Sequence, residues 1–288
     1  MHLRGRLFTL ITACMFGLGA VLAKLVGENF NAFFAAWMAL AGGGIFVACF
    51  QFCRRKALFP TMTPVVWRNM LLFSSLGTAL PLVCIIVGLA QTSAITGSFL
   101  LQLQGPAAII FAVVFLREKM GWKQAFGILL LLAGSILVIL RDFHSPTWTA
   151  SSLGDLFILI GALGIGFSYV PGKRLTEYGD ALQIVVLRLL IGSCCLLPFL
   201  AFQANFLLTP LTWPIVGVLA LYTITNFGVG YLLQQAGLGL IKAWESAAIM
   251  QTLPLFSTTF AVLILHDTLT VLQIIGGGVI LLGGLLTL

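Results

Sequence analysis

Charged residues are scarce in this sequence: Asp, Glu, Lys and Arg make up 8% of its 288 residues, whereas soluble domains average about 25%. So few charges cannot cover a water-facing surface, which excludes a soluble globular protein. With a mean hydropathy of +1.11, the composition predicts an all-α integral membrane protein. A spanning helix needs about 20 apolar residues, so this length allows roughly ten spans and no sizeable soluble domain.

Motifs for catalysis and metal binding are also missing. The sequence has no HExxH, no GxSxG, no Walker lysine, and no pair of carboxylates inside an apolar run. Its histidines are scattered, and its six cysteines form no CxxC pair and lie in or beside apolar runs, as packing residues do. We therefore predict that the protein is not an enzyme and has no catalytic residue, metal or other cofactor.

Apolar runs broken by charge, Pro or Gly predict ten spans. They cover residues 7–26, 31–53, 67–90, 96–116, 123–140, 153–172, 181–202, 213–235, 243–265 and 270–287. The polar stretch 141–152 is the natural boundary between two halves. Arg4 and Arg6 precede the first apolar run as in a signal peptide. We expect that run to be retained, because it has a counterpart in the second half.

An internal repeat relates the halves. When the sequence is shifted by 149 residues without gaps, 13 of the 52 residues from 88 to 139 are identical to their counterparts. The matches include polar residues that apolar composition does not explain: Lys24 with Lys173, Glu28 with Glu177, and Gln102 with Gln251. The sequence therefore predicts two five-span repeats, residues 1–141 and 142–288.

Because five is odd, the second repeat must enter the membrane from the opposite side. With the N-terminus in the cytoplasm, twelve of the fifteen Lys and Arg residues fall on the cytoplasmic side, as the positive-inside rule requires. The same distribution explains the net charge of +7 without nucleic-acid binding. Two inverted five-helix repeats are typical of transporters, whose substrate site lies near the midplane between the copies.

Each half closes with the pattern G-L-x(4)-A, then Q, then F-A-V-x-x-L, an acidic turn and a Gly-rich last span, as in Gly88–Glu118 and Gly237–Asp267. In these residues the chain resembles the EamA-type branch of the drug/metabolite transporter superfamily. The resemblance implies ten spans in two inverted EamA repeats, a multi-pass protein of the inner or plasma membrane, cytoplasmic termini, and export of amino acids or other metabolites. Relatives often carry an Arg in the second span of each repeat. Arg188 fits this pattern, but Ala39 stands at the other position, which argues against an amino-acid substrate.

Two symmetry-related glutamines are the first candidates for the substrate site. Gln102 and Gln251 lie inside apolar runs, each followed within one turn by a proline, Pro106 or Pro254. An unpaired amide in hydrocarbon is costly, so each must face the bundle or a wet cavity. We predict that the two glutamines face each other across the transport pathway. Bonding between neighbouring helices is the alternative.

The eighth span adds Tyr222 and Asn226, which are four residues apart and share a helix face. Their counterparts are Phe73 and Gly77, so we expect the polar wall of the site to come from the second half. Helix–helix hydrogen bonding is an equal alternative for this pair.

Arg188 is an intramembrane cation, which either binds an anionic group or closes a cytoplasmic-side passage. Snorkelling to the interface is its alternative. Trp37, Tyr169 and Trp244 are candidates for an aromatic wall that faces an apolar or cationic substrate. Interfacial anchoring is the alternative for Trp244.

Carboxylates fall at span ends or in loops, apart from Glu245, which reaches into a span and has Lys242 three residues before it. The absence of carboxylates deep in the spans favours a facilitator, with Glu245 the one candidate for proton coupling.

Glycines spaced by seven, Gly127 with Gly134 and Gly276 with Gly283, predict a small-residue stripe. The stripe packs either within the chain or against a second protomer of a homo-oligomer.

The sequence thus predicts a secondary transporter that moves a small metabolite across the lipid bilayer by alternating access, with no nucleic-acid partner. Two alternatives remain. A non-transporting scaffold or lipid-binding subunit would have glutamines that only join helices. An enzyme acting on a membrane substrate is disfavoured by the missing motifs.

Overall fold

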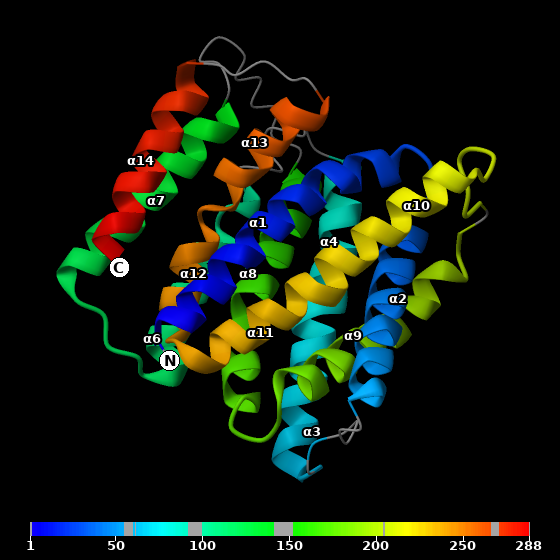
Figure 1. Cartoon of the computed structure of the whole chain (residues 1–288), viewed down its shortest axis with the longest axis horizontal. Helices are drawn as coiled ribbons and strands as arrows, with labels where there is room; N and C mark the ends of the chain where they lie inside the picture. The colour runs from blue at the N-terminus through cyan, green and yellow to red at the C-terminus, as the bar shows by residue number, and fades with distance from the viewer. Residues whose placement is uncertain are drawn as a thin grey trace.

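The structure is a computed structural model that describes residues 2–54, 60, 62–91, 100–140, 152–203, 205–265 and 271–287. Its regular elements in these ranges are all helical and pack into one bundle (Figure 1). In chain order they are α1 (His2–Gly27), α2 (Ala32–Cys53), α3 (Pro64–Leu71), η1 (Leu72–Ala79), α4 (Leu80–Leu89), α6 (Gln104–Leu116), α7 (Trp122–Leu140), α8 (Ser152–Leu175), α9 (Ala181–Leu200), α10 (Trp213–Tyr222), η2 (Thr223–Gly230), α11 (Tyr231–Leu240), α12 (Ala243–Met250), α13 (Leu253–Leu265) and α14 (Val271–Thr287).

Seven helices among the described residues are long and apolar enough to cross a membrane. Three shorter apolar helices accompany them: Gln104–Leu116, Trp122–Leu137 and Ile274–Leu286. The protein is therefore an all-α, multi-pass membrane protein, and the count of ten spans stays a prediction. The acidic turn at Asp267 and the predicted boundary between the halves at 141 lie outside the described residues.

Local sequence explains where several helices begin. Pro64 occupies the first turn of α3, where a missing N–H is tolerated, and the Thr63 hydroxyl accepts a hydrogen bond from the Val66 amide at 3.3 Å. The Asn31 side chain accepts one from the Phe33 amide at 3.0 Å to start α2. These caps satisfy backbone donors at helix ends that otherwise have no partner.

Regular α-helix is interrupted at equivalent places in the two halves. The long helices 64–89 and 213–240 each contain a π-helical segment, η1 and η2, near their middle. A turn at Gln102–Leu103 precedes α6, and a turn at Gln251–Thr252 separates α12 from α13. Pro106 and Pro254 follow these turns and lack the N–H that would continue the ladder. Such interruptions free polar backbone groups and often mark functional sites.

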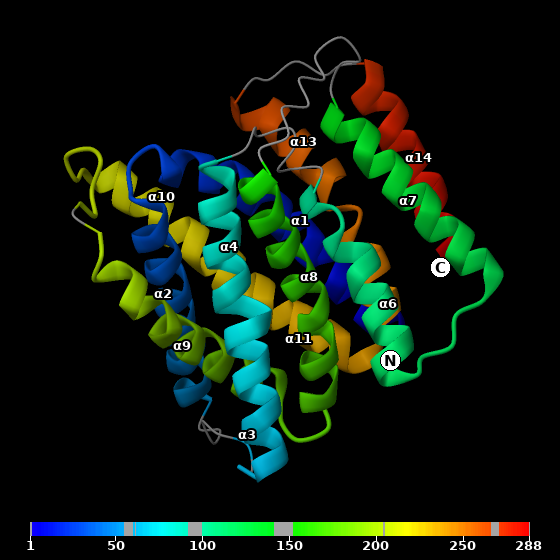
Figure 2. The same cartoon turned by 180° about the vertical axis from the view of Figure 1, so that it is seen from behind.

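Close contacts between the halves are reciprocal. A Cβ on Gly134 of α7 would lie 2.7 Å from the Gly276 carbonyl oxygen of α14, and a Cβ on Gly283 would lie 2.7 Å from the Gly127 carbonyl oxygen. The 149-residue shift relates Gly134 to Gly283 and Gly276 to Gly127, so each contact is the counterpart of the other. A two-fold relation between the halves requires this reciprocity. The glycine stripes therefore pack inside the chain, where α7 and α14 run side by side in both views (Figures 1 and 2).

Candidate functional site

A cavity of about 320 Å³ lies in the middle of the bundle, between the two halves. The first half lines it from α1, η1, α4 and α6. The second half lines it from α8, α9, α10, η2, α11 and the α12–α13 junction. Its α1 residues run from Phe16 to Ala23, whereas residues nearer the N-terminus do not line it. Along α1, the lining of the cavity therefore begins near mid-helix.

Arg188 of α9 is the one charged residue among the described lining residues. Its side chain is buried, and its Nε donates a hydrogen bond to the Thr78 hydroxyl at 2.8 Å. The guanidinium lies 4.1 Å from the ring centroid of Phe73 and 4.2 Å from that of Tyr231, which holds it by cation–π contact. Arg188 thus sits in the bundle interior and does not reach the lipid boundary.

Amide side chains give the cavity its remaining polarity. Asn226 Oδ1, Gln234 Oε1 and Gln251 Nε2 are buried and have no hydrogen-bond partner. Gln251 packs against Gly105, where a Cβ would lie 2.5 Å from its Oε1. Buried polar atoms are almost always paired in folded proteins, so a cluster of unpaired amides in a cavity is the kind of arrangement that a polar ligand satisfies.

The other predicted site residues fall in different places. Tyr222 lines the cavity beside Asn226. Gln102 is buried, and its Nε2 has no hydrogen-bond partner. It does not line the cavity, whereas Gln104 and Gly105 do. Trp37 of α2 stacks on Phe34, 6.2 Å between centroids, and is not a lining residue.

The aromatic candidates also separate. Tyr169 lines the cavity, and its hydroxyl accepts a hydrogen bond from Gln234 Nε2 at 3.4 Å. Trp244 is 6% exposed and packs in the core against residues of α6 and α14. The alternative that Trp244 anchors at the lipid interface does not match its buried position, because neighbouring helices enclose the start of α12.

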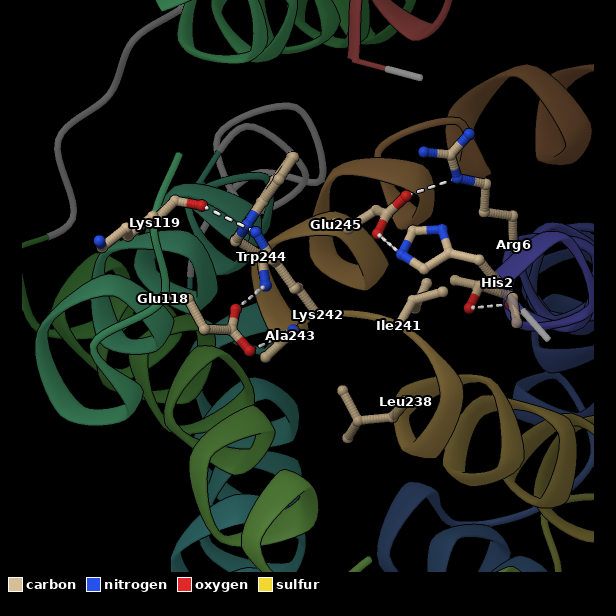
Figure 3. Close-up of polar contacts among 12 residues, drawn as sticks. His2, Arg6, Glu118, Lys119, Leu238, Ile241, Lys242, Ala243, Trp244 and Glu245 are labelled. Carbon is tan, nitrogen blue, oxygen red and sulfur yellow. Dashed lines mark hydrogen bonds and ion pairs between the residues drawn. The ribbon is translucent and has the colours of Figure 1, made fainter. Parts of the chain in front are cut away.

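A polar cluster closes the bundle at the end where α1 begins, which we call the N-terminal face (Figure 3). Glu118, in the turn after α6, accepts hydrogen bonds from the backbone amides of Ala243 at 2.9 Å and Trp244 at 3.0 Å. These are the first amides of α12, where the helix dipole favours a negative group. A carboxylate of the first half thus caps a helix of the second half.

Glu245, in the first turn of α12, makes the second link across this face. Its Oε1 accepts a hydrogen bond from Arg6 Nε at 2.5 Å, and its Oε2 lies 3.5 Å from His2 Nε2 (Figure 3). The Glu245 side chain is only 4% exposed. The spacing of Lys242, three residues before Glu245, suits a local ion pair. In the structure Lys242 Nζ instead donates a hydrogen bond to the Lys119 carbonyl oxygen at 3.2 Å.

Lys173 of α8 adds a link within the second half. Its Nζ donates hydrogen bonds to the carbonyl oxygens of Leu238 at 2.7 Å and Ile241 at 2.6 Å, where a cation stabilises the end of α11. Sequence reasoning marked Glu118 and Lys173 only as members of the repeat. Their capping role depends on long-range contacts that no local pattern indicates.

The opposite face is tied together by backbone contacts. The Asn31 amide donates to the Phe206 carbonyl at 3.0 Å, and the Leu208 amide donates to the Asn29 carbonyl at 2.9 Å. These bonds join the turn between α1 and α2 to the segment before α10. In the described residues no group of three or more His, Cys, Asp or Glu side chains is placed to hold a metal ion.

Comparison with known proteins places this architecture among transporters. The model of the EamA-like transporter family matches residues 3–140 and 152–288. A Bacillus subtilis protein named uncharacterized transporter YetK is 27% identical over 267 residues, which cover 90% of this chain and 79% of the relative. A chloroplastic WAT1-related protein of Arabidopsis thaliana is 24% identical, with 92% of this chain and 64% of the relative covered.

Two further likenesses are narrower. The riboflavin transporter ImpX of Fusobacterium nucleatum is 32% identical over 113 residues, which cover 38% of this chain and 37% of ImpX. A crystal structure superposes with a TM-score of 0.81 over 98% of this chain and 96% of its own, at 14% identity. At that identity the likeness is one of fold.

Proposed function

Because the chain belongs to the EamA-like transporter family, within the drug/metabolite transporter superfamily, we propose that it carries a small metabolite by alternating access. In this proposal ten spans form two inverted repeats, residues 1–141 and 142–288, in the inner or plasma membrane. Both termini are cytoplasmic, and a small metabolite is moved outward, for which amino acids and related compounds are the first probes. The seven long and three shorter apolar helices support the span count.

The observation that carries this proposal is the central cavity between the two halves. Its lining joins a buried cation, Arg188, to unpaired amide atoms of Asn226 and Gln251. Tyr222 borders the same space. We propose these four as substrate-binding residues. Gln102 and Trp37 lie outside the lining, so we propose that they support the helices around it. A scaffold or lipid-binding subunit gives no reason for unpaired amides in a cavity.

Closure at the N-terminal face supports the alternating-access step. Glu118 and Glu245 link the two halves there, and backbone bonds between residues 29–31 and 206–208 link them at the opposite face. The basic residues around these links suit a cytoplasmic face. We propose that opening of this cytoplasmic face is one step of the transport cycle. Glu245 is the one candidate through which protons couple to that step, and without such coupling the protein is a facilitator.

Counterflow in proteoliposomes tests the proposed function. Purified protein is reconstituted, loaded with pooled amino acids and related metabolites, and supplied with trace radiolabelled pools outside, with and without a pH gradient. The proposal predicts exchange above protein-free liposomes that Gln251→Ala lowers at least tenfold, with thermal stability retained. Gradient stimulation lost in Glu245→Gln supports proton coupling. Absence of exchange for every pool, with folded protein, favours the scaffold alternative.

A further inference from the structure

The cavity holds a positive charge that no side chain of the described residues neutralises. Arg188 is 5% exposed, its Nε bonds to a neutral hydroxyl, and aromatic rings cover it. A buried charge without a counter-charge is strongly unfavourable, and intramembrane cations normally pair with an acid or serve a ligand. This charge therefore needs a partner from outside the protein.

The two carboxylates whose partners are described at the N-terminal face are committed there. Glu118 caps α12, and Glu245 pairs with Arg6 and His2 at the N-terminal face. The first half adds no second cation, because Ala39 occupies the position equivalent to Arg188. The lining thus presents a single positive charge, which one negative charge balances.

The other lining residues indicate what the uncharged part of the ligand is like. Phe16, Tyr222 and Phe227 supply aromatic surface, while Asn226 and Gln251 keep amide atoms free for hydrogen bonds. The volume of about 320 Å³ is at the small end of ligand sites. Resting on the proposed transport function, we propose that the substrate is a small organic monoanion with a flat aromatic body.

A charge series of matched probes tests this proposal on the purified protein. Benzenesulfonate is an anion at every accessible pH, benzenesulfonamide is its neutral analogue, and phenyltrimethylammonium is a cation of similar size; naphthalenesulfonate and phenylpyruvate extend the anions in size. Thermal unfolding in detergent is measured for the parent protein, for Arg188→Gln and Arg188→Lys, and for the exposed control Arg68→Gln.

The proposal predicts that at least one monoanion raises the midpoint temperature by about 3 °C at ten times its Kd, with no such effect from the sulfonamide or the cation. Arg188→Gln loses the effect, Arg188→Lys retains part of it, and Arg68→Gln leaves it unchanged. Equal protection by the neutral or cationic probe, protection that survives in Arg188→Gln, or no protection by any anion overturns the proposal. Counterflow of a neutral or cationic solute without anion binding overturns this inference alone, whereas anion binding without any counterflow overturns the transport function.

Discussion

Arg6 and Glu245 are 239 residues apart in the chain, yet Arg6 Nε and Glu245 Oε1 are 2.5 Å apart at the N-terminal face. The pair joins the first helix of the first half to α12 of the second half. Because Glu245 is almost fully buried while Arg6 is 29% exposed, removing Arg6 leaves a carboxylate with little solvent to replace its partner.

We expect Arg6→Gln to weaken closure of this face. The loss should be about 1–2 kcal/mol, since the pair is partly screened by solvent. A reporter cysteine at Thr9, which is fully buried at this face, should then react roughly tenfold faster with an impermeant maleimide, in a background with the six native cysteines replaced. The exposed Arg4→Gln is the control. An unchanged labelling rate in Arg6→Gln would show that the pair does not hold the face closed.

Glu118 gives an independent prediction at the same face. Glu118→Ala removes the carboxylate that caps the first amides of α12, which should cost about 1 kcal/mol. Thr9Cys labelling should rise several-fold while the helical content stays the same by circular dichroism. Glu177→Gln, an exposed acidic residue after α8, should have no effect. Equal rates in the two variants would rule out a capping role in closure.

Two glycines of α14 should respond differently to replacement by alanine, because one of them packs closely against α7 and the other does not. Gly283→Ala places a Cβ 2.7 Å from the Gly127 carbonyl oxygen, whereas a Cβ on Gly278 meets nothing within 4 Å. Gly283→Ala should destabilise the protein by about 1–3 kcal/mol, and Gly278→Ala should be neutral or stabilising because alanine favours helix. Thermal unfolding in detergent measures both. A stable Gly283→Ala variant would mean that the helices do not pack this closely.

The two equivalent glutamines should differ in function. Gln251 lines the cavity and Gln102 does not, so Gln251→Ala should lower counterflow at least tenfold, while Gln102→Ala should act mainly on stability. Counterflow normalised to folded protein, with thermal unfolding measured in parallel, separates the two effects. Equal loss of flux in both variants at equal stability would return Gln102 to the substrate pathway.

Much of the fold is encoded in features that are local in sequence. The apolar runs predict the helices, and the glycine spacing predicts a small-residue stripe, which the structure places between α7 and α14. The prolines after Gln102 and Gln251 predict the interruptions there. These signals depend on composition and spacing alone, so they can be read without knowledge of packing.

The site was less predictable, because its lining depends on helix rotation. Depth and polarity selected Gln251, Tyr222, Asn226 and Arg188, which line the cavity, but also Gln102 and Trp37, which do not. The π-helical segments, which contain the lining residues Thr78 and Asn226, have no clear sequence signal. The links made by Glu118 and Glu245 also depend on which helix ends meet in space.

Reversible locking of the N-terminal face tests alternating access most directly. Cysteines replace Glu118 and Ala243, whose groups are in contact across the halves, in the cysteine-free background, and a short bifunctional thiosulfonate joins them. Each single cysteine treated with the same reagent is the control. The account predicts that counterflow stops on cross-linking and returns on reduction. Undiminished counterflow in fully cross-linked protein would contradict the account, because substrate would then cross without opening of this face.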